Sequence, residues 1–372
     1  MDSCDALVVG GGPAGSSCAR LLTQAGLDVV VLDKSEFPRD KVCAGWITPQ
    51  VVETLQLDTD DYAQGRVFQP ITAFVTGLGK GAPVTVAYDH VISYGIRRCE
   101  FDNYLLRRSG ARLKLGEPLS TIERQGSHWL INDSIRTPVV IGAGGHFCPV
   151  ARFLGAQFGR DEHAISAQEI EFEMTPAQLD ACGVAPEQPE LYFCDDLKGY
   201  GWCFRKGNFL NVGLGREESH GLAKHLELFR EWLIAEGRIP AQSPARFKGH
   251  AYLLRTQSPR SIVDHGVLLV GDAAGLAYPQ SGEGIRPAIE SGMIAAQVVI
   301  AAAGDLSRDR IEDYEAQLQA RFGARNARSL PLCPPGIRAA LARTLLKTEW
   351  FARHVVLNRW FLHSEQPTLA FS

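Results

Sequence analysis

The chain has 372 residues, of which 45% are hydrophobic and 22% charged, and its formal net charge is −4. These values are ordinary for a globular protein with a large core, and they exclude a general nucleic-acid binder. The apolar runs are too short for a signal peptide or a membrane span, so we expect a cytoplasmic protein. Nine scattered cysteines without C-x-x-C spacing argue against a disulfide framework and against a metal site.

The first stretch with a clear architecture is ALVVGGGPAGSSCARLLTQAGLDVVVLD, residues 6–33. A buried strand leads into G-x-G-x-x-G at Gly10, Gly12 and Gly15, a helix follows, and a second strand ends at Asp33. The glycines allow a tight turn, close approach to a pyrophosphate, and close packing of helix on strand. The helix N-terminus attracts the phosphates, and the acid accepts ribose hydroxyls. This unit predicts dinucleotide binding, and the acid favours FAD or NAD over NADP.

The middle of the chain indicates a loop and then two kinds of sheet. Residues 37–49, FPRDKVCAGWITP, are too rich in Pro and Gly for regular structure, yet their aromatic residues and cysteine indicate function. Alternation predicts strands at 71–76 and 84–88, a helix at 100–108, and strands at 112–115, 120–124, 129–131 and 139–141. A different sheet is predicted over 164–215, where AISAQEIEFEM alternates with polar residues on both faces. A helix at 222–235 and a strand at 246–253 follow.

The apolar strand at 267–270 returns the chain to the parallel sheet, before a helix at 284–303 and further helices from residue 308. We therefore expect an α/β fold: a βαβ, Rossmann-like cofactor domain of discontinuous segments with an inserted, mostly antiparallel β-sheet substrate domain. The expected cofactor domain is 1–70, 97–160 and 262–328, and the expected sheet domain is 71–96 and 161–261. Residues 329–372 are expected to form a helical C-terminal segment, with a break at 329–336.

A second cofactor signal is LLVGDAAGLAYPQSGEGIRPAIESG, residues 268–292. The strand delivers Gly271 and Asp272, whose carboxylate suits a ribityl or phosphate-side hydroxyl. Gly282 and Gly284 then form a turn into a helix whose N-terminal N–H groups would stabilise negative charge on a flavin edge.

The pairing of GGGPAG with GDAAGxxxPxxGEGI resembles the FAD-binding fold of p-hydroxybenzoate hydroxylase, which class A flavin monooxygenases, flavin-dependent halogenases and geranylgeranyl reductases share. Three more segments resemble the geranylgeranyl reductase branch: FPRDKVCAG at 37–45, RCEFDNYL at 98–105 and GYGWCFRKGNFLNVGLG at 199–215. The sequence departs from that branch in Cys-Ala-Gly-Trp after Val42 and in Arg205, where the family has Pro. Gly144 replaces a carboxylate of the hydroxylases, and the halogenase W-x-W-x-I-P segment is missing, so the reductase branch is favoured.

The resemblance implies FAD as the cofactor. The residues expected to bind it are Gly10, Gly12, Pro13, Ala14, Gly15, Asp33, Lys34, Lys41, Val42, Cys43, Arg98, Gly271, Asp272, Gly282, Gly284 and Ile285. Cys43 and Trp46 are implied catalytic candidates, and Tyr200, Trp202, Phe204 and Pro279 are expected to line the substrate cavity. Tyr200 and Trp202 would alternatively be ordinary strand core.

Cys43 and the stretch 336–361 each allow two interpretations. The Cys43 thiol, near Lys41, would have a lowered pKa and protonate a substrate carbon, or it is a small apolar filler. Residues 336–361 interleave Arg and Lys with Trp and Phe, a pattern typical of contact with an anionic membrane surface or of helices packed on the body.

The expected function is an FAD-dependent oxidoreductase that transfers hydride from reduced FAD to a C=C bond of an apolar, isoprenoid-like substrate. The alternative is a class A flavin monooxygenase that hydroxylates or epoxidises an aromatic or polyketide-type substrate. A third class is a flavoprotein that only relays electrons or binds a ligand. The chain lacks a second G-x-G-x-x-G, so the electron donor would be transiently bound NAD(P)H or a reductase or ferredoxin.

Overall fold

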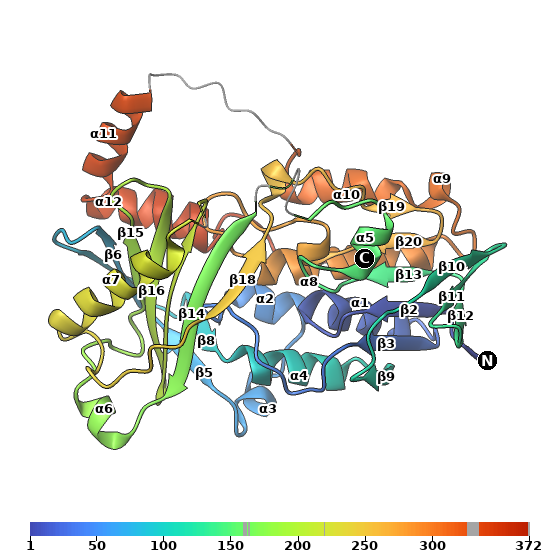
Figure 1. The fold of residues 1–372 in the computed structure, drawn as a ribbon, viewed down its shortest axis with the longest axis horizontal. Helices are drawn as coiled ribbons and strands as arrows, with labels where there is room; N and C mark the ends of the chain where they lie inside the picture. Colours follow the sequence, from blue (N-terminus) through green and yellow to red (C-terminus); the bar gives the residue numbers. More distant parts are fainter. Residues whose placement is uncertain (159–161, 163, 219, 326–334, 371–372) are drawn as a thin grey trace. The chain divides into compact units, whose positions relative to one another are not determined.

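The computed structural model describes residues 1–158, 162, 164–218, 220–325 and 335–370, and these form two compact units (Figure 1). The first unit comprises residues 1–40, 99–164 and 252–327, and the second comprises 41–98, 165–251 and 328–372. Each unit is thus assembled from three segments that alternate along the chain. Residues 41–70, expected with the cofactor domain, group with the second unit, as does the C-terminal segment.

A six-stranded sheet with the order β19-β20-β13-β2-β3-β9 forms the centre of the first unit. Its pairs are parallel except β19–β20, and the four residues of β2 and the five of β3 are all buried, as their continuous apolar sequences require. The strands are β2 (Ala6–Val9), β3 (Val29–Asp33), β9 (Arg112–Leu115), β13 (Val140–Gly142), β19 (Val263–Asp264) and β20 (Val267–Leu269). A four-stranded sheet contains β1 (Asp2–Ser3), β10 (Ile122–Gln125), β11 (His128–Ile131) and β12 (Ile135–Thr137).

The helices of this unit are α1 (Pro13–Gln24), α4 (Arg98–Arg108, whose first residue belongs to the second unit), α5 (Pro149–Phe153), α8 (Ile285–Ala301), α9 (Arg308–Ile311) and α10 (Asp313–Phe322). The most intimate helix contact joins α1 to α8. A Cβ atom at Gly292 of α8 would overlap the carbonyl oxygen of Ala14 on α1, so the two backbones touch directly. This contact fixes the starts of two helices that lie far apart in the sequence.

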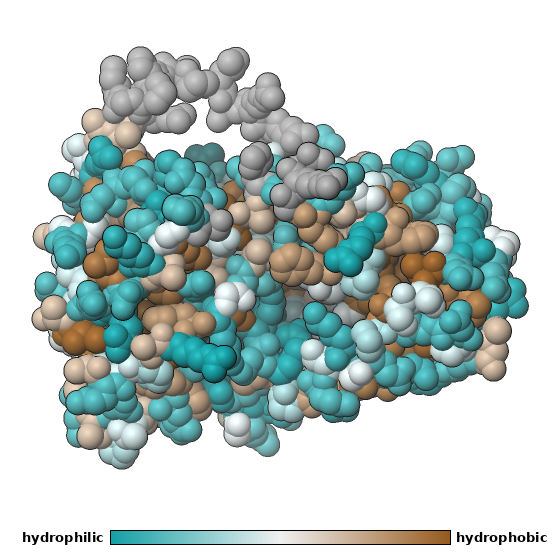
Figure 2. Space-filling view, in the orientation of Figure 1, coloured by the Kyte–Doolittle hydropathy of each residue, from teal (hydrophilic) through white to brown (hydrophobic). Residues whose placement is uncertain are grey.

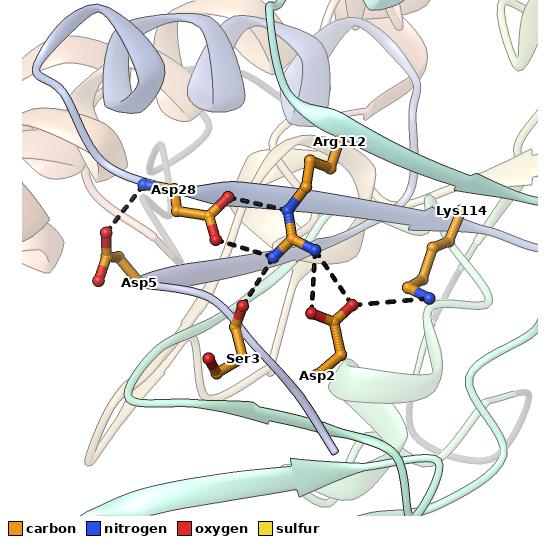
Figure 3. Close-up of polar contacts among 6 residues, drawn as sticks. All are labelled: Asp2, Ser3, Asp5, Asp28, Arg112 and Lys114. Carbon is orange, nitrogen blue, oxygen red and sulfur yellow. Dashed lines mark hydrogen bonds and ion pairs between the residues drawn. The ribbon is translucent and has the colours of Figure 1, made fainter.

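Arg112 ties the start of the chain to the central sheet (Figure 3). Its guanidinium binds the Asp28 carboxylate at 2.8–2.9 Å, the Asp2 carboxylate at 3.0–3.1 Å and the Ser3 carbonyl at 2.7 Å. The hydrogen bond from Arg112 lowers the pKa of Asp2. Since these groups are solvent-exposed, the cluster fixes the position of β1 more than it stabilises the fold.

The second unit is built on a seven-stranded sheet with the order β18-β14-β17-β16-β15-β6-β7. The pairs β14–β17, β17–β16, β16–β15 and β6–β7 are antiparallel, whereas β15 and β6 are parallel. The strands are β6 (Ala73–Leu78), β7 (Val84–Ala87), β14 (Ile165–Glu173), β15 (Glu190–Phe193), β16 (Gly199–Lys206), β17 (Phe209–Arg216) and β18 (Lys248–Tyr252). A smaller sheet contains β4 (Trp46–Ile47), β5 (Phe68–Ile71) and β8 (Ser93–Ile96).

The helices of the second unit are α2 (Pro49–Thr54), α3 (Thr59–Ala63), α6 (Pro176–Asp180), α7 (Leu222–Ala235), α11 (Pro335–Leu345), α12 (Glu349–Phe351) and a π-type helix at Ala352–Phe361. One face of the sheet packs against α7, where Leu210 and Val212 of β17 join Leu233 in an apolar core. The opposite face carries the polar and aromatic residues described below.

The α/β fold with a helical C-terminus is confirmed. The loop at 37–49 was expected to lack regular structure, and this is wrong at Trp46–Ile47, which pairs as β4 with β8. The expected strand at 71–76 is two strands, because β5 and β6 join different sheets on either side of Thr72. Residues 329–334 of the expected break lie outside the described residues.

Glu290 of α8 holds a buried ion network, and we predict that it is essential for the stability of the first unit. Its carboxylate binds Arg286 at 2.9 Å and Arg321 at 2.6 and 2.8 Å. Glu290→Gln would leave two largely buried guanidinium groups without their counterion, which costs about 3–5 kcal/mol. We expect that loss in urea unfolding, whereas Glu315→Gln, at an exposed carboxylate 3.6 Å from Arg325, should change stability by less than about 1 kcal/mol. Equal stabilities of the two variants would contradict this assignment.

Candidate active site

The turn between β2 and α1 is built so that only glycine fits at two of its positions. Gly10 has a φ of +115°, and a Cβ there would overlap the carbonyl oxygen of Ala143. A Cβ at Gly15 would overlap the carbonyl oxygen of Gly10. The backbone at Gly10 therefore packs directly against Ala143, just after β13, and the backbone at Gly15 packs against Gly10, as a phosphate-binding turn requires.

The first turn of α1 offers backbone N–H groups for an anion. Gly12 precedes the helix, and in the part of the chain that the structure describes its cap has no side-chain hydrogen bond and no acidic residue in the first turn. A Cβ at Gly12 would meet only Arg39, at 3.4 Å, so the space above this position is open. Pro13 and Ala14 occupy the first two helical positions. The uncapped turn, with its partial positive charge, fits a pyrophosphate.

Asp33 ends β3 beside this turn and is 8% exposed. Its carboxylate accepts the Gly11 N–H at 2.7 Å and the Ser35 N–H at 2.9 Å, one at each oxygen. Each carboxylate oxygen has a second lone pair, so the group remains able to accept ribose hydroxyls. Lys34, the next residue, is exposed.

The second glycine turn lies in the same unit. Residues 271–273 form a short 3-10 turn after β20, and α8 begins at Ile285 after Gly284. A Cβ at Gly284 would lie 3.3 Å from Asp272 Oδ1, so this turn lies against the Asp272 carboxylate. Because α1 and α8 touch at Ala14 and Gly292, the two helix starts are fixed relative to each other.

Two functional candidates of the first unit were missed in the sequence. Glu283 accepts the Arg286 N–H at 2.8 Å at the start of α8, and burial raises its pKa to about 7. Arg260 donates to the Ala273 carbonyl at 2.9 Å and binds Glu162 at 2.5 and 2.7 Å. Arg260 thus holds the chain at Asp272–Ala273 in place. The only sequence signal for Glu283 was its position within GEGI.

Comparison with known proteins supports this geometry. A family model described as "FAD binding domain" matches residues 3–58. The chain is 29% identical to a digeranylgeranylglycerophospholipid reductase of Methanocaldococcus jannaschii, over 84% of this chain and 82% of that one. A solved geranylgeranyl bacteriochlorophyll reductase-like structure from Thermoplasma acidophilum has a TM-score of 0.74 at 24% identity, covering 93% of this chain and 88% of that one. The chain is an FAD-dependent oxidoreductase that is similar to geranylgeranyl reductases.

A menaquinone reductase of Mycobacterium tuberculosis is also similar, at 28% identity over 87% of this chain and 81% of that one. The match to the FAD-binding family model shows that FAD is the cofactor of this oxidoreductase. The uncapped start of α1 and the open space at Gly12 fit the pyrophosphate of FAD. Of the residues expected to bind FAD, those that lie in the first unit are Gly10, Gly12, Pro13, Ala14, Gly15, Asp33, Lys34, Gly271, Asp272, Gly282, Gly284 and Ile285. Lys41, Val42, Cys43 and Arg98 belong to the second unit.

In the second unit, the Cys43 loop of this reductase-like chain is fastened to the sheet by side chains from β16 and β17. Asn211 Nδ2 donates to the Cys43 carbonyl at 3.2 Å, and Lys206 Nζ donates to the Ala44 and Ile96 carbonyls at 3.0 Å. Trp46 is buried and stacks on Phe204, with ring centroids 5.0 Å apart.

The expectation that Lys41 lowers the pKa of Cys43 is wrong. Burial raises the pKa of the Cys43 thiol, and the cation that opposes this shift is Arg98, which hydrogen-bonds to the side chain. Lys41 Nζ instead lies 2.6 Å from Nε2 of His250 on β18. Residues 41 and 43 are close in sequence, but their side chains engage different partners.

The expected substrate-lining residues of β16 share one face of the sheet. Tyr200, Trp202 and Phe204 alternate with residues of the α7 face. Trp202 donates to Asn211 Oδ1 at 2.7 Å, and the half-buried Tyr200 contacts Phe361, with centroids 5.2 Å apart. Pro279 lies in the first unit.

The charged residues on this face were not predicted from the sequence. Glu169 and Glu171 of β14 line up across the sheet with Gly213 and Asn211 of β17. Glu171 forms an ion pair with Lys206 at 2.5 Å, and although burial raises its pKa, Lys206 produces a net lowering. The available signal was the alternation of carboxylates in AISAQEIEFEM, which is unusual for a strand that also buries Ile165 and Ala167.

Gly12→Ala tests the pyrophosphate position. The added methyl group contacts only Arg39, so we expect the free energy of unfolding of the FAD-free protein to change by less than about 0.5 kcal/mol. The methyl occupies the space at the start of α1, so the dissociation constant for FAD should rise about tenfold or more, measured by quenching of FAD fluorescence. In contrast, Gly15→Ala should destabilise the unit itself. Unchanged FAD affinity in a folded Gly12→Ala protein would contradict the assignment.

Proposed function

We propose that this oxidoreductase reduces carbon–carbon double bonds in a polyprenyl chain, using FAD. The observation that carries the proposal is the similarity of this chain, over 84–88% of its length, to relatives whose names specify a geranylgeranyl lipid as substrate. Bound FAD supplies hydride in such a reaction. The reductant that reloads FAD is, in this proposal, NAD(P)H or a reductase or ferredoxin.

The chain's own residues have separate roles in this proposal. The glycine turn and α1 bind the pyrophosphate, Asp33 binds the ribose, and Asp272 with the start of α8 binds the ribityl side of FAD. In the second unit, the aromatic face of β16 lines the space for the apolar chain, and Trp46 supports the loop through its stack on Phe204.

Cys43 is the proposed proton donor. Its raised pKa keeps the thiol protonated at neutral pH, so it holds a proton to give rather than acting as a nucleophile. The Asn211 and Lys206 contacts fix the loop so that the thiol keeps one position.

The reaction is tested by mixing the chemically reduced, FAD-loaded protein with a geranylgeranyl compound in the absence of oxygen. We expect the flavin absorbance to reappear as the double bond is reduced, with the product identified by mass spectrometry. Cys43→Ser should slow this step by roughly 100-fold, the usual contribution of a positioned acid, while FAD binding is retained. A monooxygenase would be reoxidised only by oxygen, and wild-type rates in Cys43→Ser would dismiss the proton-donor role.

The proposal includes contact with a membrane surface through the C-terminal segment. The structure has no helix, among the residues it describes, that is long and apolar enough to cross a membrane. Figure 2 shows a face that is mostly hydrophilic, with small apolar patches. Within 336–361, Val356, Leu357 and Phe361 are buried, whereas Leu341 is 54% and Trp350 64% exposed.

Exposed Leu and Trp side chains beside basic residues suit an anionic lipid surface. We expect the protein to float with anionic vesicles, and the double variant Leu341→Ser, Trp350→Ser to bind about tenfold or more weakly. Leu228→Ser, at an exposed site on α7, is the matched control and should float like wild type. Equal flotation of the double variant would contradict membrane contact through this segment.

A further inference from the structure

Glu169 lies beneath the Cys43 loop, and the mechanism above leaves it unused. It is 6% exposed, on the face of β14 that carries Glu171. The register aligns it with Gly213 of β17 and, through Gly213, with Trp202 of β16. Because Gly213 has no side chain, the Trp202 ring occupies the space there, next to the strand position of Glu169.

The contacts of Glu169 point to the Cys43 loop. Its carboxylate accepts the backbone N–H of Cys43 and lies 3.3 Å from Asn211 Nδ2, which also donates to the Cys43 carbonyl. Asn211 is itself held by Trp202. Glu169 of β14 thus binds the backbone N–H of Cys43, and Asn211 of β17 binds its carbonyl oxygen.

The two neighbouring carboxylates of β14 differ in their partners. Glu171 forms the ion pair with Lys206 and a second one with Arg97 at 3.5 Å, so its anion is stabilised. Burial raises the pKa of Glu169 to about 7, with opposing hydrogen bonds from Cys43 and Asn211. The charged and titratable groups from the elements around it are Lys41, Cys43, Arg97, Arg98, Glu171, Lys206 and His250.

We propose that Glu169 is the acid that reprotonates Cys43. Its carboxylic acid protonates the Cys43 thiolate, directly or through one water, after the thiol has given its proton to the substrate. This inference rests on the proposed function. In each turnover the double bond gains a hydride from reduced FAD and a proton from the Cys43 thiol. The thiolate then regains a proton from Glu169, and the Glu169 carboxylate regains one from water.

The pairing of Cys43 with Glu169 is tested first without any substrate. The rate of Cys43 alkylation by iodoacetamide is followed against pH by mass spectrometry of the Cys43 peptide. Since the Glu169 anion disfavours a nearby thiolate, we expect Glu169→Gln to lower the apparent pKa of Cys43 and to raise its alkylation rate at pH 8.5 several-fold. Glu173→Gln, on the same strand at the exposed Asn208 contact, should behave as wild type. An unchanged Cys43 profile in Glu169→Gln would overturn the coupling.

The second arm uses anaerobic multiple turnover of the geranylgeranyl compound with excess dithionite as reductant, because Glu169 acts only after Cys43 has given its first proton. The wild-type rate should fall as the pH rises through about 7, because only protonated Glu169 can give a proton. Glu169→Gln should lose this pH dependence and slow by roughly 10- to 100-fold at unchanged FAD affinity, and Glu169→Asp should restore part of the rate. A wild-type rate and pH profile in Glu169→Gln would overturn the proposal. If wild-type protein binds FAD but leaves the alkene intact, the proposed function fails, and the alkylation arm alone decides whether the two residues are coupled.

Discussion

The direct contact of α1 with α8 is the constraint on which the cofactor half of the molecule depends. Gly292 lies against the Ala14 carbonyl so closely that any side chain there would separate the helices. That contact sets the distance between two helix starts, each preceded by a glycine turn. The start of α1 has no side-chain cap, and its partial positive charge suits an anionic cofactor, whereas at the start of α8 the Glu283 carboxylate accepts the Arg286 N–H.

In the second unit, the irregular Cys43 loop is held against one face of the large sheet by buried polar side chains. Lys206 is almost fully buried and donates to the Ala44 carbonyl of the loop and to the Ile96 carbonyl of β8, while it neutralises Glu171. A buried charge is tolerated only when its hydrogen bonds are satisfied, and here the loop and β8 supply the backbone acceptors. The loop position and the charged face therefore depend on each other. Glu169 and Asn211 extend the same arrangement to Cys43 itself.

The predictable parts of the site were those encoded by local sequence. Gly10, Gly12, Gly15 and Asp33 follow from one βαβ pattern whose strands and helix form within a few residues of the expected bounds. The predicted effect of Lys41 on the pKa of Cys43 was wrong because the Lys41 side chain contacts His250 instead. The cation that acts on the Cys43 thiol is Arg98. Glu169 was missed because alternation in a strand shows which residues share a face, without showing what covers that face.

The sequence by itself determined the class of fold, the glycine turns and the cofactor, because these depend on the backbone conformation and hydrophobic period of short segments. Only the tertiary structure decided that β14, β16 and β17 place their carboxylates, lysine and amide beneath the Cys43 loop. Those residues are separated from Cys43 by more than 100 positions, and their protonation depends on burial and on neighbours that only the folded chain supplies.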